Sequence, residues 1–229
     1  MRAYLQALPL AAEFAIVILG GFGVFILSTF LSLLTATTAS NPDSTWWYSG
    51  GHLISLIIYD VLVGAALFAF LRARGWSLER LGVRFGAVDT LIGFGLAALA
   101  LVAAWAIFWA VTTVSPAAGQ ALSAPGVTPR GFGLATAIIV SIVDAIFEEI
   151  FVCGYVVMVL KERADSMTAV TISTAIRLLY HLYEGPIAFV GVIPFGLVMA
   201  GWYARTGRLW PVIVGHGLYD FISVVGYVS

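Results

Sequence analysis

Ionisable side chains recur at helical spacing inside the apolar carboxyl-terminal half of the chain. Three pairs are four residues apart, and they are Asp144 with Glu148, Arg177 with His181, and His216 with Asp220. Residues four apart share one face of a helix, so each pair gives its helix a polar face. Charged groups inside membrane helices are costly and usually face a protein or water-filled interior. We therefore expect three helices to turn these faces toward one cavity.

The residue types in these pairs indicate hydrolysis. A buried glutamate such as Glu148 can act as a general base. Two histidines can bind a metal, orient water or donate to an oxyanion. At about 1.5 Å per residue, Glu148 and His181 lie roughly 18–21 Å from the side of the basic loops, and His216 roughly 10 Å. All three thus fall within ~30 Å of hydrocarbon.

The composition indicates an integral membrane protein. Of the 229 residues, 61% are hydrophobic and only 10% are charged, and the mean hydropathy is +1.02. A soluble domain of this size could not bury so much apolar surface. The net charge of −1 gives no reason to propose nucleic acid as a partner. The single cysteine, Cys153, excludes an intrachain disulfide framework and a cysteine-based structural zinc site.

Seven apolar segments are each close to the length that crosses a bilayer. They run near residues 10–34, 52–71, 90–113, 133–160, 167–183, 186–204 and 210–228. We predict an all-α, polytopic transmembrane helix bundle of about seven helices, with residues 1–229 forming one integral membrane domain. The cavity is expected between helices four, five and seven. Asp89 stands at the expected N-cap of the third segment, and Asp60 in the second is expected to be paired within the bundle.

The basic residues predict the orientation in the membrane. One set of alternate loops and helix ends holds Arg72, Arg74, Arg80, Arg84, Lys161, Arg163, Arg205 and Arg208, whereas the opposite loops hold only Arg130. This pattern places the amino terminus in the cytoplasm and the carboxyl terminus outside. Because no eukaryotic targeting or retention signal appears, we expect a multi-pass protein of a bacterial plasma (inner) membrane.

Three motifs in order resemble the CPBP family, the CAAX protease and bacteriocin-processing (Abi) proteins. The stretch from Glu148-Glu149 to Cys153-Gly154 resembles a first motif of two glutamates, three variable residues and Arg-Gly. Arg177 to His181 resembles the second motif, an aromatic residue or arginine four before a histidine. His216 to Asp220 is similar to the last, a histidine four before Asn or Asp. The resemblance covers residues 137–225, which we interpret as the catalytic core.

The resemblance implies an intramembrane endopeptidase that hydrolyses membrane-associated or CAAX-like substrates. In that mapping Glu148 activates water and Glu149 assists. His181 positions the water or a metal, while His216 and Asp220 stabilise the oxyanion or complete the site.

The resemblance leaves the cofactor open. A zinc ion held by Glu148, His181 and His216 and a metal-independent glutamate mechanism are both compatible with it. Asp144 is expected to support the site. The expected partners are a peptide or membrane-protein substrate and the lipid bilayer.

Cys153 departs from the family pattern, because it occupies the arginine position of the first motif. Arg177 could reach the same cavity from the fifth segment and supply that charge. The alternative is a weakened or non-catalytic member that acts in bacteriocin self-immunity or as a membrane-protein partner. A small transporter is the third interpretation, although the repeat symmetry and matching broken helices typical of transporters are not evident in the sequence.

Overall fold

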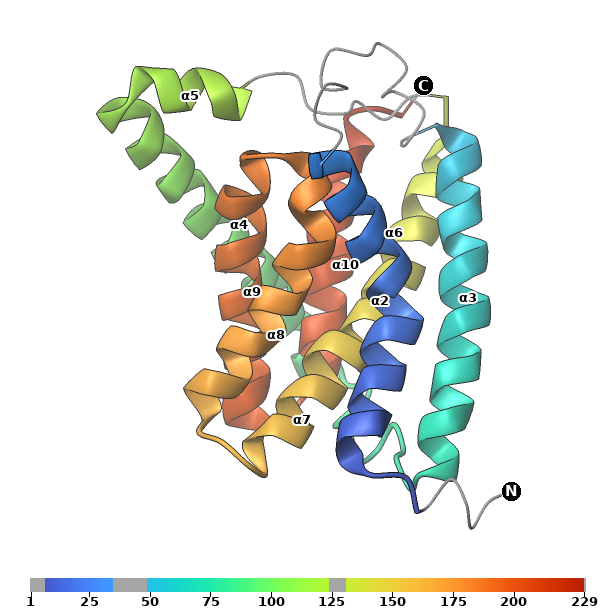
Figure 1. Ribbon diagram of the computed structural model, residues 1–229. Helices are drawn as coiled ribbons and strands as arrows, with labels where there is room; N and C mark the ends of the chain where they lie inside the picture. The colour runs from blue at the N-terminus through green and yellow to red at the C-terminus, as the bar shows by residue number, and fades with distance from the viewer. Residues whose placement is uncertain (1–6, 35–48, 124–130, 229) are drawn as a thin grey trace.

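Long apolar helices form the first half of the chain. The computed structural model describes residues 7–34, 49–123 and 131–228. Helix α2 spans Leu10–Leu34, α3 spans Gly50–Ala73, α4 spans Ala87–Val114 and the short α5 spans Pro116–Ser123. Figure 1 shows α2 and α3 on one side of the bundle and α4 with α5 on the other. Many large apolar side chains of α2 to α4 are exposed, as expected where a helix faces lipid.

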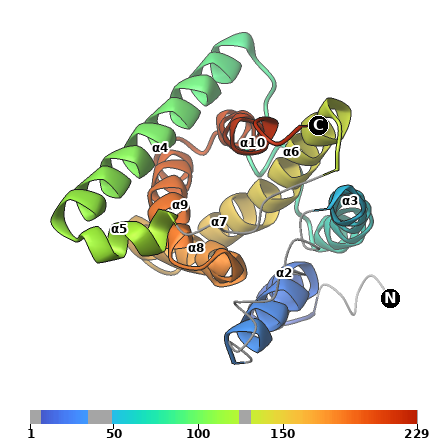
Figure 2. The same ribbon diagram turned by 90° about the horizontal axis from the view of Figure 1, so that it is seen from above.

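The first motif lies on a continuous helical run that changes register. It consists of α6 (Leu134–Glu148), the π-helix η3 (Glu149–Tyr155) and α7 (Val156–Lys161). A π-helix is rare and frequently occurs at functional sites. Here it begins directly after Glu148. In Figure 2 this run passes between the α2–α3 pair and the helices α9 and α10.

The remaining helices have clear local reasons for their bounds. These are α8 (Ser166–His181), the 3₁₀ turn η4 (Leu182–Glu184), α9 (Ile187–Thr206) and α10 (Trp210–Val225). The Asp165 side chain caps α8 by accepting from the backbone N–H groups of Met167 and Thr168. Helix α9 ends at Thr206 and is followed by Gly207, whose φ of 65° is the left-handed conformation that favours glycine at a helix end.

The predicted helical bundle is confirmed, and a described helical segment coincides with each of the seven predicted stretches. Four described helices, α2, α3, α4 and α9, are long and apolar enough to cross a membrane, and α10 is a shorter apolar helix. The protein is therefore a multi-pass membrane protein. The N-cap prediction for Asp89 is wrong, because α4 begins at Ala87 after an extended Gly86. Asp89 instead lies in the first turn and pairs with Arg208.

Glycines allow the backbone of α10, the last helix, to pack closely against α4 and α6. A Cβ atom added at Gly215 of α10 would lie 2.9 Å from the carbonyl oxygen of Gly93 in α4. One added at Gly217 would lie 3.2 Å from the carbonyl oxygen of Ser141 in α6. Close approach of this kind is what small residues permit in membrane proteins. It fixes α10, and with it His216, against α6.

Candidate active site

Glu148 is the meeting point of two neighbouring helices. It is the last residue of α6 and is buried. Its Oε2 atom accepts a hydrogen bond of 2.5 Å from Arg177 Nη1 and one of 2.6 Å from Tyr180 Oη, both on α8. Charge-assisted hydrogen bonds are the strong ones. They fix the carboxylate and leave its Oε1 atom to face elsewhere.

Glu149 shares the same guanidinium. It is the first residue of the π-helix and is fully buried. Its Oε1 atom accepts from Arg177 Nη2 at 2.6 Å and lies 2.7 Å from His216 Nδ1. Arg177 can join both glutamates because its planar fork carries several donors in fixed directions. Its Cζ atom also lies 5.0 Å from the ring centroid of Phe195.

His181 faces the unoccupied side of Glu148. Its Nε2 atom lies 3.7 Å from Glu148 Oε1, and its Nδ1 atom lies 3.0 Å from Glu184 Oε1 in η4. A carboxylate at one ring nitrogen orients a histidine and sets what the other nitrogen can do. Glu184 therefore aims Nε2 of His181 toward Glu148.

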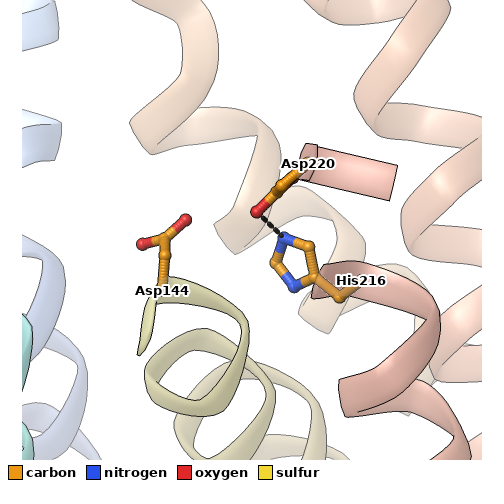
Figure 3. A group of neighbouring side chains, drawn as sticks. All are labelled: Asp144, His216 and Asp220. Carbon is orange, nitrogen blue, oxygen red and sulfur yellow. Dashed lines mark ion pairs between the residues drawn. The ribbon is translucent and has the colours of Figure 1, made fainter. Parts of the chain in front are cut away.

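His216 approaches from α10 on the opposite side. Its Nε2 atom lies 3.2 Å from Asp220 Oδ2 and 4.0 Å from Glu148 Oε2. Its ring packs against Phe195, with 4.8 Å between the ring centroids. Figure 3 shows the His216–Asp220 ion pair on α10 with Asp144 facing it from α6.

The partners of the two glutamates, Arg177, His181 and His216, line a cavity of about 430 Å³, whereas Glu148 and Glu149 lie behind them. The ionisable residues that line it are Asp144, Arg177, His181, Glu184, His216 and Asp220. They come from α6, α8, η4 and α10, and α3 and α9 supply further walls. Seven of the eight residues that the sequence singled out therefore either take part in these ion pairs or line the cavity. Their chemical roles stay predictions.

Cys153 is the eighth residue. It lies in the π-helix, is fully buried beside Glu149 and, like Glu148 and Glu149, does not line the cavity. Arg177 provides the guanidinium that contacts both glutamates, which is the geometry proposed for it from the sequence.

Two compact groups of described residues offer metal ligands. One is Glu148, Glu149 and His216, and the other is Asp144, His216 and Asp220. Within each, the candidate ligand atoms lie within 4.8 Å of one another. His181, which the zinc interpretation included, belongs to neither group.

Three acidic or phenolic groups were missed or left without a role by sequence reasoning. Tyr180 and Glu184 flank His181 and contact the site from positions that no motif marks. For Glu184 the only signal was its spacing of three from His181. Asp60 of α3 is buried and meets the carboxyl group of Asp144 on α6, which is a partner within the bundle of the kind expected for it.

Comparison with protein families supports the resemblance that the motifs indicated. Residues 130–222 match the model described as type II CAAX prenyl endopeptidase Rce1-like. The matched stretch contains α6 to η4, α9 and most of α10, and therefore every described residue that forms an ion pair with Glu148 or Glu149. No curated protein and no solved structure matches the chain.

Proposed function

We propose that the chain is an intramembrane endopeptidase whose general base is Glu148, on the basis that residues 130–222 match the model described as type II CAAX prenyl endopeptidase Rce1-like. The observation that carries the proposal is the unequal environment of the two Glu148 oxygens. Oε2 is held by Arg177 and Tyr180, while Oε1 faces His181 Nε2 at 3.7 Å. That gap is too long for a direct hydrogen bond and suits a water molecule that bridges the two groups.

Water bound there would be activated for attack on a peptide carbonyl. Glu148 Oε1 takes one proton from the water, and the water oxygen forms a bond to the carbonyl carbon. Negative charge then develops on the carbonyl oxygen, where a positioned N–H donor stabilises it. We assign this role to His216, which lines the cavity and whose Nε2 atom now lies 3.2 Å from Asp220 Oδ2. As the C–N bond breaks, Glu148 returns its proton to the leaving amine.

A metal-independent mechanism fits this site better than zinc bound at Glu148. The guanidinium of Arg177 already contacts both Glu148 and Glu149, and a second cation beside it would be repelled. The group Asp144, His216 and Asp220 fits zinc better, since it offers the nitrogen and oxygen ligands of an open catalytic site. Zinc there would polarise a carbonyl. We therefore include a chelator in the test below.

The rival proposal is a non-catalytic member that acts through binding. It is favoured by Cys153, which replaces the arginine of the family motif. Against it stands Arg177, which supplies a guanidinium to both glutamates from another helix. A binding function would survive the loss of Glu148, whereas the hydrolytic function would not.

The decisive experiment is hydrolysis of a fluorogenic peptide panel, including CAAX-like sequences, by the full chain in detergent. Glu148→Gln is the test variant, and Glu79→Gln, at an exposed loop position, is the matched control. We expect cleavage by the wild type and the control and none by Glu148→Gln, with and without chelator. Activity of Glu148→Gln equal to the wild type would overturn the proposal. If the chelator abolished cleavage by the wild type, the metal-assisted mechanism would replace the metal-independent one.

A further inference from the structure

The cavity opens at one end of the bundle. Besides residues 140–144 of α6, its wall is built from the first turns of α3, the end of α8 with η4, the first half of α9 and the second half of α10. In Figure 1 these helix ends lie at the top, on the side of the carboxyl terminus. Tyr227, just beyond α10, lines the cavity and is 44% exposed. We take this residue as the marker of the cavity mouth.

The opposite end of the bundle is closed by packed loops. Leu81 and Leu209, from two different loops, are fully buried. The backbone N–H of Leu209 donates to the carbonyl of Gly82 at 3.0 Å. Tyr203 of α9 donates its hydroxyl to the carbonyl of Leu81 at 3.1 Å. A peptide therefore has no described route to Glu148 from this end.

The closed end carries nearly all the basic residues. Of the eleven Lys and Arg residues in the chain, eight lie there, namely Arg72, Arg74, Arg80, Arg84, Lys161, Arg163, Arg205 and Arg208. The ion pair of Arg80 with Glu162 and the hydrogen bond of Lys161 to the Ala204 carbonyl join the separate loops. Arg177 is in the cavity, and Arg2 and Arg130 lie outside the described residues. Loops rich in Lys and Arg are retained on the cytoplasmic side.

We propose that the cavity mouth faces away from the cytoplasm, so that the site accepts peptide segments presented at the outer face of the membrane. This inference rests on the proposed peptidase function. The substrate class would be exported peptides, or extracytoplasmic segments of membrane proteins. A CAAX sequence at the end of a cytoplasmic protein would meet only the closed end. The chain would thus share chemistry with the family it matches while drawing substrates from the other side.

Orientation can be tested without any enzyme assay, because the chain has one cysteine. Cys153 is fully buried, so the wild type serves as the unlabelled background. Tyr227→Cys marks the mouth, and Glu79→Cys marks the closed end at an exposed position. Intact bacteria expressing each variant are treated with a membrane-impermeant maleimide, and permeabilised cells give full labelling for reference.

We expect Tyr227→Cys to be labelled in intact cells and Glu79→Cys only after permeabilisation. The reverse pattern, or equal labelling of both in intact cells, would overturn the proposal. Failure of the peptide assay in detergent would refute the peptidase function and leave this orientation result standing, so the two failures are distinguishable.

The side of substrate entry is then tested with a membrane-impermeant peptide that the detergent-solubilised protein cleaves. Spheroplasts expose the outer face, and inverted vesicles expose the cytoplasmic face. We expect Glu148-dependent cleavage by spheroplasts and by detergent-opened inverted vesicles. Sealed inverted vesicles should leave the peptide intact. Cleavage by sealed inverted vesicles would show entry from the cytoplasm and refute the proposal.

Discussion

Arg177 is a buried side chain that pairs with two consecutive glutamates. It is among the largest fully buried side chains, and within the described part of the chain it forms ion pairs with Glu148 and Glu149. Removing one member of a buried ion pair leaves an uncompensated charge and is strongly destabilising. Two carboxylates on consecutive residues would also repel each other without a cation between them. The guanidinium therefore both permits the acidic pair and orients it.

Replacing Arg177 should abolish hydrolysis, and moving the charge back to the family position should restore part of it. We expect Arg177→Gln to lower kcat/KM by about 10²-fold or more, as for loss of a key charged donor. Cys153→Arg in the same chain returns a guanidinium to the π-helix beside Glu149. Initial rates on the fluorogenic peptide measure the effect, with Arg84→Gln at an exposed position as control. Wild-type rates in Arg177→Gln would show that the guanidinium is dispensable.

Tyr180 is a positioning residue that sequence motifs do not mark. Its hydroxyl donates to Glu148 Oε2 at 2.6 Å, and a hydrogen bond to a charged group contributes about 1.5–3 kcal/mol. Tyr180→Phe should therefore reduce kcat roughly 10- to 100-fold and change KM little. Tyr59→Phe is the matched control, because its hydroxyl binds the Gly21 carbonyl in α2, away from the site. An unchanged kcat in Tyr180→Phe would show that the Tyr180 hydroxyl does not contribute to catalysis.

Sequence patterns predict helices better than they predict the contacts between them. The apolar stretches locate every long helix to within a few residues, because hydrocarbon thickness fixes helix length. The four-residue spacings also place each polar pair on one face. The register change at Glu149 leaves no such trace, and neither does the pairing of Glu13 with Tyr155, which are 142 residues apart. Those features depend on packing between helices distant in sequence.

Glu13 anchors the first described helix to the rest of the bundle. Its Oε1 atom accepts from Trp76 Nε1 and from Tyr155 Oη, each at 3.0 Å, and its Oε2 atom pairs with Arg74. Glu13→Ala leaves the donors of Trp76 and Tyr155 without this acceptor and removes the carboxylate partner of Arg74, at a cost of roughly 3–5 kcal/mol. We expect a clear fall in the thermal unfolding midpoint in detergent. Glu79→Ala, at an exposed position, should keep the wild-type midpoint, and equal midpoints for both variants would contradict the assignment.

The cap of α8 should make stability depend on pH. Hydrogen bonds from the Thr168 hydroxyl, and from the N–H groups of Thr168 and Met167, lower the pKa of the exposed Asp165 carboxyl. A lowered folded-state pKa stabilises the protein above the ordinary carboxyl pKa, and that contribution is lost as the pH falls through the lowered value. The thermal midpoint of Asp165→Ala should thus lie below that of the wild type at neutral pH, and the gap should close in acid. A gap independent of pH would exclude this cause.

The family match begins close to the start of α6, but helices of the first half of the chain also contribute to the whole site. Leu53 and Leu56 of α3 line the cavity, and Gly93 of α4 receives the backbone of α10 at Gly215. Helix α2 packs on α8 through Phe22, which stacks on Tyr180 with 4.9 Å between ring centroids. The helices of the first half of the chain therefore pack against α10 and α8, which carry His216 and Tyr180.

A fragment of residues 131–229 should consequently fail as an enzyme on its own. Without α3 and α4 the apolar faces of α6 and α10 lose their partners, and small-residue contacts of this type are what hold membrane helices together. We expect no Glu148-dependent cleavage from this fragment. Co-expression with residues 1–130 should restore cleavage, because helices inserted separately can reassemble through the same contacts. Co-purification of the two fragments and peptide hydrolysis are the measurements. Full activity of 131–229 alone would show that the first half serves another purpose, whereas co-purification without activity would indicate that the covalent connection itself sets the geometry at Glu148.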